Sequence, residues 1–115
     1  MQKNTYGKAG EIIATNYLKE KNYRIIATNY KNKIGEIDIV AKDGNYIVFI
    51  EVKARESKGF GHPLEAVNMQ KQFKIRQVAE LFLISKKLTK CLCRFDVISI
   101  LGFENPEIEH IENAF

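Results

Sequence analysis

Acidic and basic side chains alternate with apolar ones along residues 35–55, GEIDIVAKDGNYIVFIEVKAR. Asp38 in the first half, and Glu51 and Lys53 in the second, are spaced so that an antiparallel hairpin would place them on one face. Two carboxylates that are diagonal neighbours, with Cβ atoms roughly 7 Å apart, can close on one divalent cation, and without a cation they would repel each other. The stretch predicts a metal site beside a lysine, a combination suited to phosphodiester hydrolysis.

The hairpin is predicted by Asp43-Gly44, which lies between two runs of β-branched and aromatic residues. A loop of two or four residues would place Asp38 opposite Phe49 and Glu36 opposite Glu51. A three-residue loop or a bulge would instead turn one strand over and separate the carboxylates. We expect the other face of the hairpin to be the core side, made by Ile37, Ile39, Ala41, Tyr46, Val48, Ile50, Val52 and Ala54.

The acidic face could instead be solvated, with Lys53 serving only to neutralise Asp38 and Glu51. Against this alternative, the apolar residues Val40 and Phe49 belong to the same face, together with Ile47. A site that is partly covered by another element explains this mixture better than an open sheet surface does.

Residues 4–21 have the pattern of a helix, with Ala14 and Leu18 on its apolar side. Glu11 falls on that side too, about 20° from Leu18 at 100° per residue. A glutamate facing the core needs a cation or a donor, so we expect Glu11 to join the hairpin cluster. The alternative is that Glu11 flanks the apolar stripe and extends to solvent.

A strand over 23–30 should precede the hairpin, and Pro63 suits the first turn of a helix over 63–87. In that helix Lys71 and Gln72 lie at the edges of the apolar stripe, from which they could reach towards the hairpin or lie along the surface. A fourth strand is predicted over 94–101, followed by an acidic tail. The helical stripe comprises Leu64, Val67, Ile75, Val78, Ala79 and Phe82.

Length and composition fit one domain over residues 1–115, with 45% hydrophobic and 28% charged residues. No apolar run is long enough to span a membrane, and the N-terminus lacks the apolar middle of a secretion signal, so we expect a cytoplasmic protein. The net charge of +4 is uneven, because all 18 Lys and Arg lie in residues 1–94. That part carries 9 acids and a charge of +9, which favours a polyanionic partner, with Arg55 and Lys58 as candidate phosphate contacts beside the hairpin.

Cys91 and Cys93 form a lone CxC with no second pair. Neither His62 nor His110 lies at a recognisable ligand spacing from them, so a zinc site is not predicted. We expect one cysteine to be buried in a strand and the other to lie on its opposite face.

The order of helix, three strands, helix and strand, with an acid on the first helix and Asp38 followed by Glu51-Val52-Lys53 on the hairpin, resembles the restriction-endonuclease-like PD-(D/E)xK nuclease fold. More specifically, YGKAGE, GEIDIVAKDG, FIEVKAR, FGHP and RFDVI are similar to the UPF0102 (YraN-like) family, bacterial proteins considered distant relatives of archaeal Holliday junction resolvases. This resemblance spans nearly the whole chain. Ile37 stands where the name of the fold would put proline.

The resemblance implies an α/β fold with a mixed central sheet flanked by helices, and a site that binds Mg²⁺ or Mn²⁺. By position, Glu11, Asp38 and Glu51 match the metal-binding acids, and Lys53 matches the lysine near the scissile phosphate. Val52 would lend its carbonyl to the metal. Gln72, after Lys71, stands where some nucleases of this fold place a helper residue.

These observations predict a metal-dependent endonuclease that acts on DNA, with branched or structured DNA as a candidate substrate. The alternative is a nucleic-acid-binding module that keeps the fold but cuts nothing. Clustered acids favour the enzyme, because a pure binder gains nothing from negative charge where phosphate must lie. An enzyme that resolves junctions would need two sites and therefore a homodimer. A protein-interaction domain has only the acidic tail in its favour.

Overall fold

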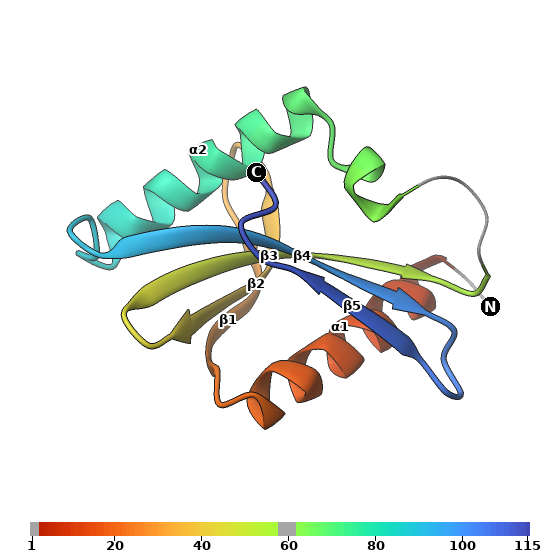
Figure 1. The fold of residues 1–115 in the computed structure, drawn as a ribbon. Coiled ribbons are helices and arrows are strands. Elements are labelled where there is room, and N and C mark those ends of the chain that lie inside the picture. The colour runs from red at the N-terminus through yellow and green to blue at the C-terminus, as the bar shows by residue number, and fades with distance from the viewer. Residues whose placement is uncertain (1–2, 58–61) are drawn as a thin grey trace.

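The computed structural model describes residues 3–57 and 62–115 as one mixed sheet with a helix on each face (Figure 1). The strands lie in chain order, with β3 and β4 parallel and the other neighbours antiparallel. In the described residues, neither helix is long and apolar enough to cross a membrane. The elements are α1 (Lys3–Glu20), β1 (Arg24–Lys31), β2 (Glu36–Asp43), β3 (Tyr46–Arg55), the 3-10 helix η1 (Pro63–Ala66), α2 (Met69–Ser85), β4 (Leu92–Leu101) and β5 (Glu107–Ile111).

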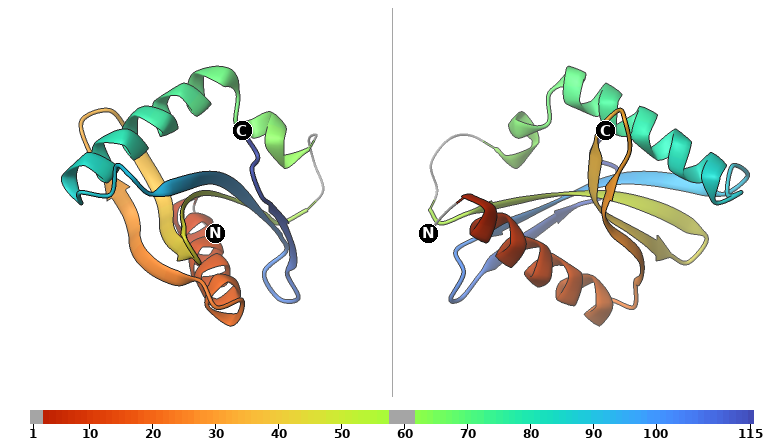
Figure 2. Two further views of the ribbon diagram at one scale, coloured as in Figure 1. Left: turned by 60° about the vertical axis from the view of Figure 1, so that its left-hand side comes forward. Right: turned by 180° about the vertical axis from the view of Figure 1, so that it is seen from behind.

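This arrangement confirms the predicted α/β class and the order helix, three strands, helix, strand, and it is compatible with a restriction-endonuclease-like core. Figure 2 shows from two further sides that α1 and α2 cover opposite faces of the sheet. β5 was not predicted, because its short segment EIEHI alternates acids with only two isoleucines. It pairs with β4 and so continues the sheet beyond the predicted strands.

Helix α1 packs closely on β3. Ala14 and Leu18 are fully buried, as the helical pattern predicts. Gly10 permits the close contact, since a Cβ atom built there would lie 2.6 Å from Cβ of Ala54. This layer fixes the position of Glu11, which directly follows Gly10. The buried core on this side comprises Ala14, Leu18, Tyr23, Ile39, Ala41, Val48, Ile50, Ile98 and Ile100.

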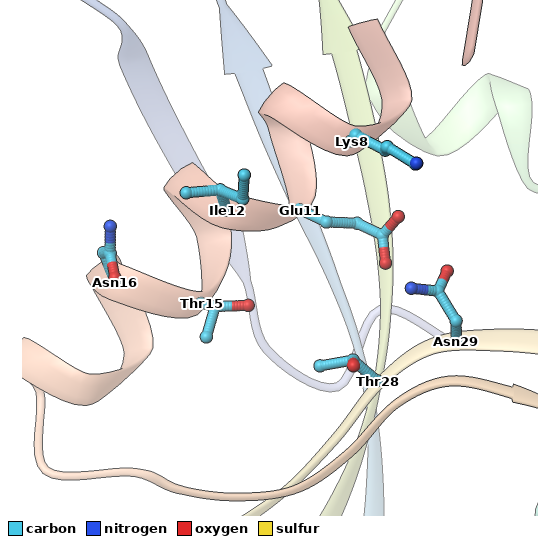
Figure 3. A pocket seen from close by; sticks show the side chains of 7 residues that line it. All are labelled: Lys8, Glu11, Ile12, Thr15, Asn16, Thr28 and Asn29. Carbon is cyan, nitrogen blue, oxygen red and sulfur yellow. The ribbon is translucent and has the colours of Figure 1, made fainter. Parts of the chain in front are cut away.

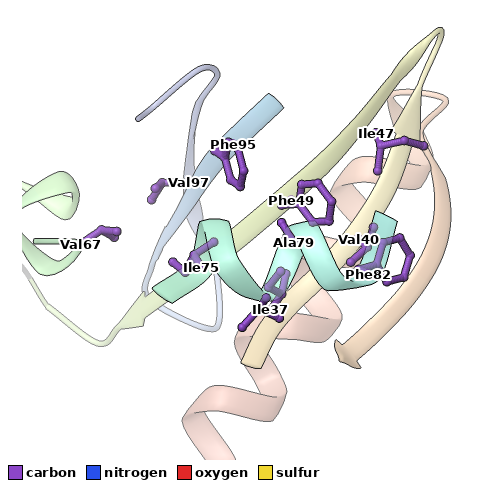
Figure 4. Close-up of a cluster of buried hydrophobic side chains, with 11 residues drawn as sticks. Ile37, Val40, Ile47, Phe49, Val67, Ile75, Ala79, Phe82, Phe95 and Val97 are labelled. Carbon is purple, nitrogen blue, oxygen red and sulfur yellow. The ribbon is translucent and has the colours of Figure 1, made fainter. Parts of the chain in front are cut away.

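Helix α2 covers the other face of the sheet (Figure 4). Val40 and Phe49, expected on a partly covered face, are fully buried here, so both faces of the hairpin are core and the prediction of a single core side is wrong. The continuous apolar sequence of β3 agrees with this, because a strand paired in parallel and covered on both faces needs no alternation. The cluster comprises Ile37, Val40, Ile47, Phe49, Val67, Ile75, Val78, Ala79, Phe82, Phe95 and Val97.

The predicted hairpin register is wrong by two residues. Asp43 pairs with Tyr46 and Val40 with Phe49, so the loop consists of Gly44 and Asn45. Gly44 takes a left-handed φ of 59°, which glycine adopts without steric cost, and Asp43 therefore remains in the strand. Because the shift is an even number of residues, the side chains of the paired residues keep their predicted faces. Ile37 lies beyond the paired residues, and it packs under α2 instead of sharing the predicted face with Ile39.

The predicted helix over 63–87 is two helices. η1 ends at Ala66, and α2 begins at Met69. Between them Asn68 is extended, with φ −72° and ψ 174°, and its side chain accepts a hydrogen bond of 2.9 Å from the N–H of Lys71. This is an N-cap, and it starts a new helix even though the apolar stripe continues across the break.

The last two strands enclose a buried polar cluster. Asp96 is fully buried, and both its oxygens accept hydrogen bonds of 2.9 Å from Arg94. His110 on β5 approaches the same carboxylate at 2.7 Å, and the N–H of Asn113 donates to it at 3.1 Å. Arg94 also donates to the hydroxyl of Tyr23 at 2.6 Å. The cluster therefore ties the C-terminal segment to the sheet.

Cys91 directly precedes β4 and Cys93 lies near its start, and neither cysteine is fully buried. Cys91 is half-buried and Cys93 is exposed. The expectation of one buried cysteine is wrong, because the chain reaches the covered part of the sheet only at Arg94.

Candidate functional site

Asp38 lies where β2 separates from β3. Paired residues of the hairpin run from Asp43 and Tyr46 to Ile39 and Ile50. Beyond them, Oδ2 of Asp38 accepts a hydrogen bond of 2.8 Å from the N–H of Val52. The alternation of β2 also breaks here, because Ile37 packs under α2 and Ile39 under α1. The carboxylate of Asp38 thus takes the place of a backbone partner and is held against β3.

Glu51 is the second carboxylate of the site, and it is only 8% exposed. Its Oε1 lies 3.0 Å from Nζ of Lys71 on α2 and 4.0 Å from Nζ of Lys53 on β3. The structure thus brings the predicted residues Asp38, Glu51 and Lys53 together and adds Lys71 to them. A cavity of about 310 Å³ opens here, lined by Gly35, Glu36, Asp38, Glu51, Lys71, Lys74, Ile75 and Val78.

Burial and neighbouring negative charge raise the pKa of Asp38 to about 7. Burial has the largest effect, the charge of Glu51 comes next, and Glu11 and Glu36 add smaller contributions. The hydrogen bond from Val52 acts in the opposite direction but does not compensate. Asp38 therefore lies in a place where a further positive charge would be strongly stabilised.

The two lysines of the site differ in their affinity for a proton. Burial lowers the pKa of Lys53, and the neighbouring Lys71 lowers it further. Burial alone would also lower the pKa of Lys71, but its contacts with Lys53 and Glu51 raise it. Lys71 is thus the firmly charged partner of Glu51, and Lys53 is the lysine that gives up a proton more readily.

Glu11 approaches the acids from α1, where it lines a second cavity opposite Asn29 (Figure 3). Burial and the charge of Glu36 raise the pKa of Glu11, and Asn29 lowers it. Its Oε1 atom is buried without a hydrogen-bond partner. Glu11 is close enough to contribute to the raised pKa of Asp38, but it does not line the cavity that Asp38 and Glu51 share.

A divalent cation fits the donor chemistry of Asp38 and Glu51. Over residues 3–57 and 62–115, no group of three or more His, Cys, Asp or Glu side chains is arranged to hold a metal. Mg²⁺ does not need such a group, since proteins bind it through one or two carboxylates, with waters and substrate phosphates completing the shell. The repulsion at Asp38 and the unpartnered oxygen of Glu11 are both features that a cation would relieve.

The residues predicted to contact nucleic acid lie in different surroundings. Lys71 binds Glu51 instead of lying along the surface. The side-chain amide of Gln72 donates to the carbonyl of Val67 at 2.9 Å, and so it holds the turn before α2. Arg55 is half-buried at the end of β3. Lys58 lies outside the described residues.

Lys74 was missed by the sequence analysis, although it lines the cavity with Lys71. Its distance of three positions from Lys71 could have indicated this, because residues three apart lie on the same side of a helix. The hydrogen bond from the N–H of Val52 to Asp38 was not predicted either, because the resemblance implies a role only for the carbonyl of Val52.

Comparison with known proteins places this site in a sequence family. The model of the "Uncharacterised protein family UPF0102" matches residues 10–100. A UPF0102 protein of Caldicellulosiruptor saccharolyticus is 44% identical, with all of both chains covered. One from Thermodesulfovibrio yellowstonii is 50% identical over 95% of this chain and 94% of its own. One from Alkaliphilus metalliredigens is 46% identical over 95% of this chain and 96% of its own. The chain therefore belongs to the UPF0102 family.

Proposed function

We propose that the protein is a metal-dependent endonuclease that hydrolyses phosphodiester bonds of DNA. The observation that carries the proposal is the single cavity in which Asp38 and Glu51 converge, with Lys53 and Lys71 at 4.0 and 3.0 Å from Glu51. Paired carboxylates beside lysines suit the chemistry of phosphates, and a purely structural cluster has no need to keep a carboxyl with a pKa of about 7.

Asp38 and Glu51 would hold the metal ion, and Glu11 would support it from α1. Bound there, Mg²⁺ or Mn²⁺ supplies a lowered pKa for the attacking water and a positive charge against the phosphate oxygens. Lys53 would stabilise the charge that develops on the phosphate as water attacks and the P–O bond breaks.

DNA is the substrate that the charge distribution supports. Residues 1–94 carry +9, and Lys71 and Lys74 bring two positive charges to the cavity. Arg55 and Lys58 remain predicted phosphate contacts on the chain that follows the site. Branched DNA is a candidate substrate, and cutting both strands of a junction would require a homodimer.

Cleavage assays with Mg²⁺ or Mn²⁺ on linear, single-stranded, flapped and four-way DNA test the proposal directly. We expect the wild type to cut at least one of these, and Asp38→Asn and Lys53→Ala to lower the rate about 100-fold or more. Lys90→Ala is the matched control, because Lys90 is exposed in the turn before β4. The control should cut at the wild-type rate.

Separate titrations with metal and with DNA distinguish the proposed metal ligand Asp38 from the proposed phosphate contact Lys53. Asp38→Asn should weaken Mg²⁺ binding, whereas Lys53→Ala should leave it unchanged. Metal-free DNA binding should be equal or tighter for Asp38→Asn and weaker for Lys53→Ala. Salt-sensitive DNA binding without cleavage of any substrate would instead support the alternative, a nucleic-acid-binding module with a nuclease-like fold.

A further inference from the structure

A second cavity, of about 430 Å³, lies between α1 and β1 (Figure 3). Its volume falls within the range of pockets that bind small organic groups. It is built on a helix and a strand, so its walls are fixed by the fold and not by a loop. It is lined by Lys8, Glu11, Ile12, Thr15, Asn16, Thr28 and Asn29.

The lining of this cavity suits a nucleobase. Thr15, Asn16, Thr28 and Asn29 provide hydroxyl and amide groups that donate and accept hydrogen bonds without net charge. Ile12, 63% exposed, adds an apolar surface. A base combines flat apolar faces with an edge of donors and acceptors, and it matches this mixture. A phosphate matches it less well, because the carboxylate of Glu11 lines the same cavity and offsets the positive charge of Lys8.

Strand β1 is irregular where it borders the cavity. Its pairing with β2 shifts between Ile25 and Ala27, and Asn29 has a left-handed φ of 51°. Irregularities of this kind re-aim side chains, and Figure 3 shows the amide of Asn29 directed at the carboxylate of Glu11. Thr28 and Tyr30 pair with Ile39 and Ile37, so Asn29 between them lies beside Asp38 on the neighbouring strand, and the cavity adjoins the acidic site.

We propose that this cavity binds one unpaired base of a DNA strand whose neighbouring phosphate lies at Asp38 and Glu51. The proposal rests on the proposed nuclease function and narrows its substrate to DNA with an unpaired nucleotide beside the cleaved bond. The hydrogen-bonding edge of a base inside a duplex is occupied by the opposite base, so the base must first be extruded, which costs about a few kcal/mol. An already unpaired base avoids that cost, and the cavity therefore selects it.

Metal-free binding to DNA that carries 2-aminopurine tests the proposal without any cleavage. The probe is placed either at an unpaired position or in a perfect duplex. The double variant Asn16→Ala with Thr28→Val removes two polar groups from the cavity. Alanine suits the helix α1 and valine suits the strand β1, so the fold should be kept. Its control, Asn105→Ala with Thr89→Val, makes the same changes at exposed positions outside the cavity.

For the wild type and the control, we expect the fluorescence of the unpaired 2-aminopurine to change on binding. The cavity variant should lose this change and bind the unpaired DNA about 10-fold more weakly, with duplex affinity unaltered. Equal weakening on both DNAs, or no change in either, would overturn the base site, whether or not the protein cuts DNA. If the cavity variant discriminates as expected but the wild type cuts nothing, the base site stands and the nuclease function fails.

Discussion

Two aspartates of the same sheet, the half-buried Asp38 and the fully buried Asp96, have opposite surroundings. Asp96 accepts hydrogen bonds from Arg94 and Asn113 and contacts His110, and these partners outweigh burial and lower its pKa. Asp38 accepts one hydrogen bond from the backbone, lies near further acids, and has its pKa raised to about 7. One carboxylate is neutralised by the fold, and the other is left with excess negative charge.

The difference separates a carboxylate that the fold compensates from one that it does not. Asp96 has its cation built in, so the cluster is complete and ties β5 to the sheet. Over residues 3–57 and 62–115, Asp38 forms no ion pair, and the nearby Lys71 and Lys53 both contact Glu51. This uncompensated carboxylate supports the proposal that a cation binds beside Asp38.

The largest expected effect is a difference in the free energy of unfolding between substitutions of the two aspartates. Asp96→Asn leaves the buried guanidinium of Arg94 facing a neutral amide, so the free energy of unfolding should fall by about 3 kcal/mol or more. Asp38→Asn removes a repelled charge and should leave the free energy unchanged or raise it. Urea unfolding of both variants at pH 7 measures the contrast. Equal losses of stability in the two variants would contradict the difference between Asp38 and Asp96.

A smaller effect is expected from the contact that positions Glu11. Gly10→Ala forces α1 away from Ala54 and should cost about 1–3 kcal/mol. It should also lower the pKa of Asp38, because Glu11 moves away, and leave that of Asp96 unaltered. Gly7→Ala is the matched control, since nothing lies within 4 Å of a Cβ atom there, and it should stabilise α1 by about 0.5–1 kcal/mol. A Gly10→Ala protein as stable as this control would contradict the close contact.

A pH dependence of opposite sign is also expected for the two groups. In the metal-free protein, Asp38 has a folded pKa of about 7, above the unfolded value, so the folded state binds more protons between about pH 4 and 7. Stability from this group is therefore lost as pH rises through that window, with a slope of at most about 1.4 kcal/mol per pH unit. Asp96 has a lowered pKa, and its stabilisation is lost only as pH falls below about 4.

Urea midpoints of the wild type and Asp38→Asn, compared from pH 4 to 8, isolate the contribution of Asp38. The difference between the two proteins should grow in favour of Asp38→Asn as the pH rises from about 4 to 7. A difference that stays constant over this window would show that the pKa of Asp38 is not raised.

Much of the fold followed from local patterns in the sequence. Helical periodicity correctly predicted the buried stripe of α2 from Ile75 to Phe82 and the buried side of α1 at Ala14 and Leu18. The hairpin register was off because the sequence alone does not show which residue of Asp43-Gly44-Asn45 begins the loop. β5 was missed because two isoleucines among acids give little signal without the strand beside them.

The candidate site was predictable on the hairpin but not across elements. That Glu51 and Lys53 share a face follows from strand alternation, whereas Asp38 lies where the alternation of β2 breaks. The ion pair of Lys71 with Glu51 depends on how α2 lies over β3. The cluster at Asp96 was overlooked, although Arg94 and Asp96 alternate within an otherwise apolar strand and so share one face. Its third member, His110, comes from the unpredicted β5.

The carboxyl carbon of Asp38, followed by NMR as pH is varied with and without Mg²⁺, tests most directly whether the hairpin acids form a cation site. In metal-free protein the pKa should be about 7, and saturating Mg²⁺ should lower it by at least one unit, because the bound cation favours the ionised form. A pKa near 4 that does not respond to Mg²⁺ would contradict the account, since Asp38 would then be a carboxylate already compensated by the fold.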